Sequence, residues 1–424
     1  MRSETIGKEL FIQNRQRLVK ELKPNSLALF NSNDIMPTNA DGTMPFKQNT
    51  DLFYLSGIDQ EESILVVCPN FPEERYREVL FLREPNELLE KWEGHKLTKK
   101  EAEEISGVKT VAWVGDFPKL FHHMMAMGNV DNVYLNTNEH YRSDVVVETR
   151  DARFVEWCKA RYPLHQYNRV APIMAKLRRV KQKREIELMQ RACDITEKGF
   201  RRVLGFVKPG VWEYEIEAEF IHEFISNRSK GFAYTPIIAS GKSNVILHYL
   251  DNNQQCKDGD LILLDVAAEY ANYASDLTRT IPVNGRFTKR QKDVYNAVLR
   301  VHREAFRMLR PSVVYFEFQK EIEKIMQSEL IKLKLIDKKD GPDAFRKYFY
   351  HGTSHMLGLD VHDVGNMHDK VQVGSVWTIE PGIYIAEEGF GIRLENNVVI
   401  QKDKNFDLMR NIPIEAEEIE ELMK

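Results

Sequence analysis

Four acidic residues interrupt apolar, strand-like runs in the second half of this 424-residue sequence. Asp265 lies inside LILLDVA, and Asp276 lies in NYASDLTRTIPV. Glu380 directly follows SVWTI, and Glu395 lies in GIRLENNVVI. A carboxylate in a buried strand is unfavourable, and carboxylates brought together repel one another unless a cation lies between them. We therefore expect a fold in which these four side chains meet around a compensating cation.

Strand geometry gives the first indication of how the acids meet. If the turn between the first two strands centres on 270–271, then Asp265 and Asp276 lie directly opposite each other and point to the same face. Glu395 is two residues from Arg393 and therefore shares its face of a strand. Each acid also has an ordinary alternative. Asp276 can cap a turn, Asp265 can pair with a basic residue, and a single acid in a strand commonly faces solvent.

The length of the chain predicts two domains, because a single hydrophobic core usually stops growing at about 250–300 residues. In roughly the first 165 residues, apolar runs such as SILVVCP (63–69) alternate with polar helical stretches such as LTKKEAEEIS (97–106), which indicates an α/β domain. Two prolines in YPLHQYNRVAP (162–172) predict a linker. We expect an N-terminal α/β domain over 1–170 and a second domain over 171–424.

The second half has the pattern of helices packed on a mostly antiparallel sheet, an α+β domain. Apolar spacing predicts a long amphipathic helix over 179–207, ended by Lys208-Pro209-Gly210. Further helices are expected over 213–229, 289–309 and 316–334. Strand patterns at 260–270 and 272–283 form one expected pair, and those at 373–385 and 389–400 form another.

Composition excludes several classes of function. The net charge of −4 provides no positive field for nucleic acid. The polar N-terminus and the absence of a long apolar run predict no signal peptide and no membrane span. Four widely spaced cysteines predict reduced core thiols in a cytoplasmic protein. PIIASGKS (236–243) ends like a phosphate-binding loop, but Pro236 stands where the first glycine is required.

Three histidines fall within HGTSHMLGLDVHDVG (351–365), at His351, His355 and His362. The first two have the spacing of a zincin HExxH helix, but residue 352 is glycine, so the general-base glutamate of that motif is missing. With His355 as the only nitrogen ligand, four carboxylates remain to supply oxygen, and such a set suits Mn²⁺. Two bridging carboxylates would hold two ions ~3.5–4 Å apart.

The ordered set Asp265, Asp276, His355, Glu380 and Glu395 resembles the metal-ligand set of the pita-bread metallopeptidases, which include methionine aminopeptidase, prolidase and aminopeptidase P. The surrounding sequence is similar to aminopeptidase P in particular, in ILHYLDNNQ (246–254), DGDLILLDVAAEY (258–270), SDLTRTIPVNGRFT (275–288), HGTSHMLGLDVHDVG (351–365), TIEPGIYI (378–385) and GIRLENNVVI (391–400). QNTDLFYLSGIDQEESILVV (48–67) extends the resemblance into the first half. The resemblance implies a pita-bread α+β catalytic domain after a smaller creatinase-like α/β domain.

The resemblance also implies an activity, the release of the N-terminal residue from a peptide whose second residue is proline. In that family pattern Asp265 chelates one of two divalent ions, and Asp276 and Glu395 bridge both. His355 and Glu380 complete the other site, and Glu380 also takes a proton during the attack on the peptide bond.

Further roles come from the same resemblance. His248 and His362 position substrate and stabilise the tetrahedral intermediate, and His351 and Arg393 line the pocket for the penultimate proline and the chain beyond it. Tyr234 and Trp92 match aromatic walls of that pocket, with Trp92 supplied by a neighbouring subunit of a homodimer or homotetramer. The ordinary alternatives are a satisfied, partly buried His248 and a Trp92 engaged in ordinary packing near the helical pattern ELLEKWEGH (87–95).

Two rival functions share much of this pattern. A prolidase, which cleaves only X-Pro dipeptides, has the same five ligands. A non-catalytic pita-bread protein that binds peptides would have lost some of those ligands, whereas all are present here. The sequence also departs from the family in a short segment between the two glutamates, IYIAEEGFG (383–391), which shortens one rim of the site.

Overall fold

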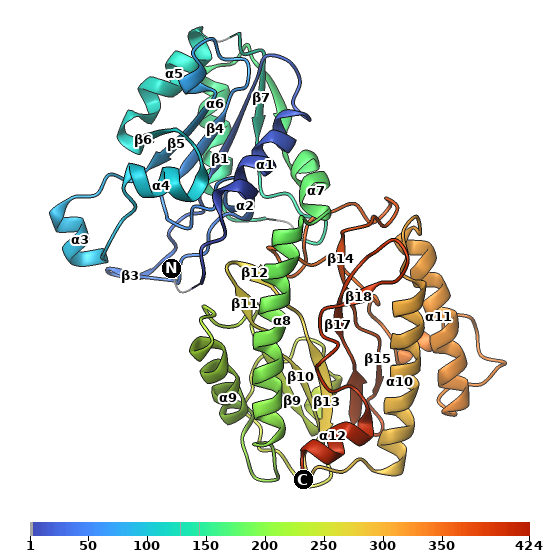
Figure 1. Cartoon of the computed structure of the whole chain (residues 1–424). Helices are drawn as coiled ribbons and strands as arrows, with labels where there is room; N and C mark the ends of the chain where they lie inside the picture. The colour runs from blue at the N-terminus through green and yellow to red at the C-terminus, as the bar shows by residue number, and fades with distance from the viewer. Residues whose placement is uncertain (1–2, 128, 144) are drawn as a thin grey trace. The chain divides into compact units, whose positions relative to one another are not determined.

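The computed structural model describes residues 3–127, 129–143 and 145–424, which form two compact units (Figure 1). One unit is Thr5–Arg178, and the other is Arg179–Lys424 together with Ser3 and Glu4. The segment 162–172, predicted as a linker, is not one. It contains strand β8 (Gln166–Arg169), which pairs in the sheet of the first unit. Because β8 is a half-exposed edge strand, it has few apolar residues, and its sequence lacks a strand signal.

A six-stranded mixed sheet forms the centre of the first unit, in the order β6-β5-β4-β1-β7-β8. The strand β4 is antiparallel to both neighbours, whereas the outer pairs are parallel. The other strands of this sheet and their bounds are β1 (Ser26–Asn31), β4 (Ile64–Val67), β5 (Glu78–Leu82), β6 (Thr110–Trp113) and β7 (Asn132–Leu135). A small hairpin, β2 (Pro37–Asn39) and β3 (Gly42–Thr43), stands apart from it.

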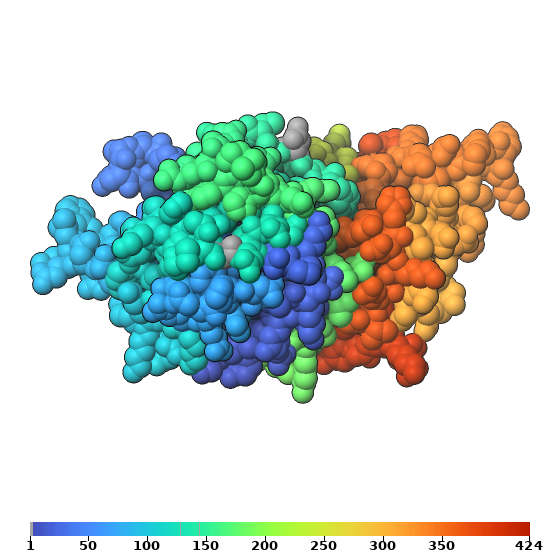
Figure 2. All heavy atoms as spheres, turned by 90° about the horizontal axis from the view of Figure 1, so that it is seen from above, coloured from blue at the N-terminus to red at the C-terminus, as the bar shows by residue number. Residues whose placement is uncertain are grey.

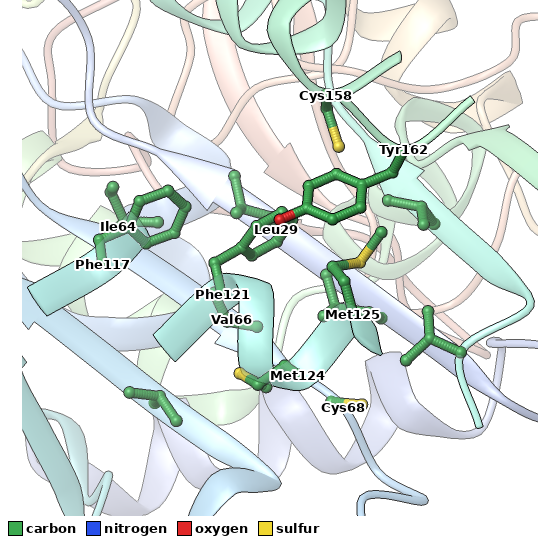
Figure 3. Close-up of a cluster of buried hydrophobic side chains, with 14 of the residues drawn as sticks. Leu29, Ile64, Val66, Cys68, Phe117, Phe121, Met124, Met125, Cys158 and Tyr162 are labelled. Carbon is green, nitrogen blue, oxygen red and sulfur yellow. The ribbon is translucent and has the colours of Figure 1, made fainter. Parts of the chain in front are cut away.

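Helices cover both faces of this sheet, as the complete burial of β1 requires. Leu27 and Leu29 pack against α5 and α6, in a cluster with Phe121 and Cys158 (Figure 3). The helices α1, α2 and α4 lie on the other face. The bounds are α1 (Lys8–Val19), α2 (Thr50–Ser56), α3 (Glu87–Glu93), α4 (Lys99–Ser106), α5 (Phe117–Met127), α6 (Arg150–Arg161) and α7 (Ala171–Arg179). The predicted α/β domain is confirmed.

All four cysteines are free and buried, as predicted for core thiols. Helix α3 projects from the edge of the first unit (Figures 1 and 2), so that its Trp92 is 79% exposed. Ordinary packing therefore does not account for Trp92.

The second unit is an α+β domain, as predicted, with strands between two pairs of helices (Figure 1). The helices are α8 (Lys183–Leu204), α9 (Glu213–Ser226), α10 (Lys289–Met308), α11 (Tyr315–Lys332) and the C-terminal α12 (Ala416–Leu422). The strands are β9 (Ile237–Ser240), β10 (Leu261–Asp265), β11 (Glu269–Tyr270), β12 (Tyr273–Ala274), β13 (Thr278–Pro282), β14 (Val376–Ile379), β15 (Gly382–Ile385), β16 (Phe390–Arg393), β17 (Asn396–Val399) and β18 (Phe406–Asp407). Every strand pair of this unit among the described residues is antiparallel.

The register of the first strand pair corrects the prediction for Asp265 and Asp276. Asp265 pairs with Thr278, not with Asp276, because the turn centres on Ala271 and Asn272. Both turn residues have left-handed backbones, with φ of 53° and 68°, which is the geometry of the tight two-residue turn. A shift of one residue in the turn moves the partner by two. Asp276 therefore keeps its face and lies diagonally across from Asp265.

The second strand pair is one long hairpin with an interruption. Val376 pairs with Val399 at its base, and Ile385 pairs with Phe390 near its tip, in a single continuous register. Residues 380–381 separate β14 from β15, and residues 394–395 separate β16 from β17. These two interruptions lie opposite each other in the hairpin. Glu380 and Glu395 occupy those two interruptions, so the register places them opposite each other.

Buried His302 on α10 makes the second unit sensitive to acid. Burial, together with the charges of Arg279 and Arg303, lowers its pKa to about 3. Because the folded pKa lies below the ~6.5 of an unfolded chain, the stability is fully present above that value and is lost as pH falls toward the folded pKa. We expect His302→Gln to flatten the fall of Tm between about pH 7 and pH 4, measured by thermal unfolding. Exposed His222 on α9 is the control, and equal slopes for parent and His302→Gln would contradict the prediction.

Candidate metal centre

Three of the predicted ligands converge. One ligand atom from each of Asp276, His355 and Glu395 lies within 4.8 Å of the others, and all three residues are buried. The Nε2 atom of His355 is 3.4 Å from Oδ2 of Asp276. Two carboxylates and an imidazole at this spacing form a donor set suited to a divalent cation.

Backbone groups fix the orientation of the His355 ring. Its Nδ1 is 3.0 Å from the carbonyl oxygen of Met356, and a carbonyl can only accept, so Nδ1 bears the proton. The Nε2 lone pair is therefore directed at the carboxylates. The His355 N–H donates to Thr378 Oγ1, which ties the segment to β14. This arrangement is typical of a histidine held ready for a metal.

The two glutamates complete the acidic wall from the interrupted hairpin. Glu380 Oε1 is 3.6 Å from His355 Nε2. Glu395 Oε2 accepts from Thr278 Oγ1 at 2.7 Å, and its backbone N–H also donates to Thr278. The second carboxylate oxygen of Glu395, Oε1, is buried and has no hydrogen-bond partner among the described residues. A buried carboxylate oxygen without a donor is a position that a cation would satisfy.

Asp265 lies at the edge of this group and accepts hydrogen bonds from one neutral and one cationic side chain. Tyr234 donates to its Oδ1 at 2.6 Å, and Arg393 donates to its Oδ2 at 2.5 Å. The three-residue cluster of potential ligand atoms does not include Asp265. Arg393 also donates to Thr278 Oγ1 and to Tyr384 Oη, so this buried guanidinium joins three elements of the site.

Electrostatics show how unfavourable the acids are without a cation. Burial, reinforced by the charges of Asp276 and Glu380, raises the pKa of Glu395 well above its usual range. Burial raises the pKa of Glu380 to about 7, although His355 and Arg393 oppose the shift. Burial lowers the pKa of His355, but contact with Asp276 and the charge of Glu380 outweigh it and raise the net value. The residues present fit a divalent ion, which would replace protons as the compensating charge.

His351 is outside the ligand cluster and ends a separate hydrogen-bonded chain. Its Nδ1 is 2.8 Å from the carbonyl of Gly352 and must donate, so its Nε2 accepts from Tyr384 Oη at 2.9 Å. The same Tyr384 oxygen accepts from Arg393 at 2.9 Å. Burial and the charge of Arg393 lower the pKa of His351 to about 4, so the ring is neutral at physiological pH.

The other residues predicted for the site lie outside the three-residue ligand cluster. The ring of His362 stands edge-on to that of His355, with centroids 4.4 Å apart. Tyr234 is half-buried against Asp265, and its pKa is raised well above its usual range by burial and by the nearby carboxylates. His248 is exposed in the turn after the short helix η3 (Gly241–Val245), and no described contact joins it to the cluster. Trp92 belongs to the other unit.

Comparison with known families decides the classification. Residues 187–402 match the model of metallopeptidase family M24, and residues 11–134 match the N-terminal domain of aminopeptidase P. The chain is also 33% identical to an Xaa-Pro aminopeptidase of Escherichia coli, over 99% of this chain and 98% of that protein. The chain belongs to metallopeptidase family M24. The resemblance found in the sequence is thereby confirmed.

Other relatives of this M24 metallopeptidase are similar to it in sequence or structure along nearly the whole chain. The Xaa-Pro aminopeptidase 3 of Homo sapiens is 32% identical, over 92% of this chain and 78% of that protein. The zinc-substituted E. coli aminopeptidase P in complex with product matches with a TM-score of 0.87 at 33% identity, covering 99% of each chain. A Bacillus anthracis protein assigned as an aminopeptidase P matches with a TM-score of 0.92 at 34% identity, covering 98% of each. These likenesses confirm the predicted two-domain fold.

Sequence reasoning missed two residues that organise the M24 site. Tyr384 connects Arg393 to His351, and Thr278 binds both Glu395 and Arg393. Aromatic residues are common in strands, so the residue type of Tyr384 carries no distinguishing signal. Thr278 is recognisable only with the corrected register, which puts it directly opposite Asp265.

Proposed function

We propose that this protein releases the N-terminal residue from peptides whose second residue is proline. The observation that carries the proposal is the buried group of Asp276, His355 and Glu395, which lies in a chain similar over its full length to Xaa-Pro aminopeptidases. The E. coli neighbour of known structure is an aminopeptidase P in complex with product, which supports the same reaction class here.

The proposed site holds two divalent ions, and Mn²⁺ suits its oxygen-rich donors. Its ligands are Asp265, Asp276, His355, Glu380 and Glu395. Both oxygens of Asp265 retain acceptor capacity beside Tyr234 and Arg393, since a carboxylate oxygen accepts more than one partner. When bound, such ions act as Lewis acids and lower the pKa of water to near neutrality.

Protein groups around the ligands have properties that suit their proposed roles. The carboxylate of Glu380 lies 3.6 Å from His355 Nε2, where it can take up and return a proton during peptide cleavage. His362 stands beside His355, where it can donate to the oxygen that becomes negative in the tetrahedral intermediate. We assign His248, which lies in an exposed turn, the same kind of contact with the peptide.

The proline pocket is proposed to lie along His351, Arg393 and Tyr234. A neutral His351 presents an apolar ring face, because both ring nitrogens are engaged by Gly352 and Tyr384. Exposed Trp92 is consistent with an aromatic side chain that a neighbouring copy receives in a homodimer or homotetramer.

We place this activity in the cytoplasm, which four free, buried cysteines support. Among the described residues, no helix combines the length and apolar character needed to cross a membrane.

The proposed activity is tested with two peptides, a tripeptide with proline second and an X-Pro dipeptide. Metal-stripped protein is assayed for release of the first residue with and without added Mn²⁺. We expect metal-dependent cleavage of the tripeptide. Cleavage of the dipeptide alone would make the protein a prolidase, and cleavage of neither would favour a peptide-binding protein without catalysis.

His351→Ala separates substrate binding from metal binding. Because His351 hydrogen-bonds to Gly352 and Tyr384 rather than to the ligands, we expect unchanged metal content and a kcat/KM for the tripeptide about 10- to 100-fold lower, mainly through KM. Metal content is measured by atomic emission, and kinetics by release of the first residue. Loss of metal from His351→Ala would show that this histidine belongs to the metal centre.

A further inference from the structure

We propose that Lys181 and Asp363 form a buried ionic anchor that positions the loop carrying His362. Lys181 Nζ donates to Asp363 Oδ2 at 2.8 Å, and each side chain is only 1% exposed. Neither residue was singled out by the sequence, and neither is among the proposed ligands. The role of the anchor in peptide cleavage rests on the proposed function.

The anchor is connected to the site by backbone hydrogen bonds. The Asp363 N–H donates at 2.9 Å to the carbonyl of Met356, the same oxygen that accepts from Nδ1 of His355. Asp363 directly follows His362, whose ring stands edge-on to that of His355. A displacement of Asp363 would therefore move His362, whereas the Met356 carbonyl would keep its hydrogen bond from His355 Nδ1.

Lys181 is fixed independently of the loop, so it can serve as a reference point. Its backbone N–H donates to Gly374 O at 3.0 Å, and the Gly374 N–H donates to Ile400 at 2.8 Å. These bonds tie the lysine to the turn before β14 and to the end of β17. The ammonium group thus holds the His362 loop against the hairpin that supplies Glu380 and Glu395.

Close packing around the ion pair leaves little freedom for another arrangement. A Cβ atom on Gly358 would lie 2.2 Å from Asp363 Oδ2 and 2.9 Å from Lys181 Cε, so only glycine fits there. The Gly358 carbonyl accepts from Ala274 N–H at 2.8 Å, which connects this packing to the strand before Asp276. The loop, the anchor and the ligand-bearing strand are therefore packed as one group.

General energetics explain why such a pair is better understood as a positioning device than as a source of stability. Withdrawing two charges from water is costly, and apolar side chains of similar shape commonly stabilise a fold as well as a buried ion pair does. What the pair adds is direction, because the ammonium and the carboxylate satisfy each other in one geometry. We therefore regard Lys181 and Asp363 as positioning residues for His362.

The first test measures the loop without using activity. Lys181→Met alone leaves a buried carboxylate without its cation and risks misfolding, so the principal variant is Lys181→Met with Asp363→Asn, which removes both charges at nearly constant shape. We expect hydrogen exchange over residues 356–365 to become at least tenfold faster in the double variant, with exchange in α10 unchanged. Unchanged exchange in the loop would overturn the proposal.

The second test is a kinetic cycle with His362→Ala. We expect the double variant to lower kcat/KM for the tripeptide about 10- to 100-fold in the parent, but less than about threefold when His362 is already alanine. Equal losses in both backgrounds would overturn the proposal, because the anchor would then act independently of His362. A parent protein that cleaves neither peptide would refute the proposed function instead, and the exchange result would still decide the anchor.

Lys183→Met is the matched control. Lys183 lies two residues further along, and its side chain is 93% exposed at 4.0 Å from Glu187. We expect its replacement to change neither the loop exchange nor kcat/KM. An effect equal to that of the double variant would show that general charge loss at the start of α8, rather than the buried pair, is responsible, and would overturn the proposal.

Discussion

Asp276→Asn is expected to abolish metal-dependent peptide cleavage while leaving the metal-free protein at least as stable as the parent. The carboxylate lies in the three-residue cluster, so its loss should lower kcat/KM by on the order of 10³-fold or more. In the absence of metal, the same substitution relieves repulsion, because the charge of Asp276 helps to raise the pKa values of Glu395 and Glu380. The measurements are bound metal, tripeptide cleavage, and Tm in chelator.

The control for this prediction is Asp293→Ala on α10, which removes an exposed acid paired with Lys289. It should retain metal and activity. A lower Tm of metal-free Asp276→Asn than of the metal-free parent would contradict the view that these acids destabilise the fold for the sake of function.

Arg393→Met is expected to lower the stability of the metal-free protein by about 3–5 kcal/mol, because it leaves the carboxylate of Asp265 buried without its cation. It also removes the donors to Tyr384 and Thr278. Lysine should not substitute, since an ammonium cannot reach three acceptors from one planar fork. Calorimetric unfolding in chelator measures the effect.

Two comparisons make the Arg393 prediction specific. Arg290→Met removes a guanidinium that pairs with Glu388 at 2.6 Å on the surface, where such pairs contribute only about 0–1 kcal/mol. Adding Asp265→Asn to Arg393→Met should restore part of the lost stability, because the unpaired charge is then absent. No recovery in this double variant would mean that Arg393 stabilises the unit mainly through Tyr384 and Thr278.

The sequence was informative where residue type conflicts with surroundings. An acid inside an apolar strand has few explanations, so all four acids were predicted to meet. The structure places Asp276, Glu380 and Glu395 together around His355, whereas Asp265 lies at the edge of the group and pairs with Arg393. The predicted opposition of Asp265 and Asp276 was wrong because turn position depends on backbone angles at Ala271 and Asn272. Residue types near a turn restrict those angles only weakly.

Other features required three-dimensional contacts that no local pattern encodes. Lys181 and Asp363 are 182 positions apart, and each is ordinary in its own segment. The strand β8 lies at the edge of its sheet, so half of its residues need not be apolar. Pairing across such distances depends on the packing of whole elements, and the family resemblance supplied it only for residues that belong to a known motif.

Continuous strand pairing on both sides of Glu380 and Glu395 makes the position of these glutamates independent of the length of the hairpin. Beyond the glutamates, β15 and β16 pair over four residues each before the chain turns at 386–389. Residues added or removed at that turn would change the length of the hairpin, while the paired strands would hold the glutamates in place. The tip of the hairpin can therefore vary in length without disturbing the backbone that carries the two glutamates.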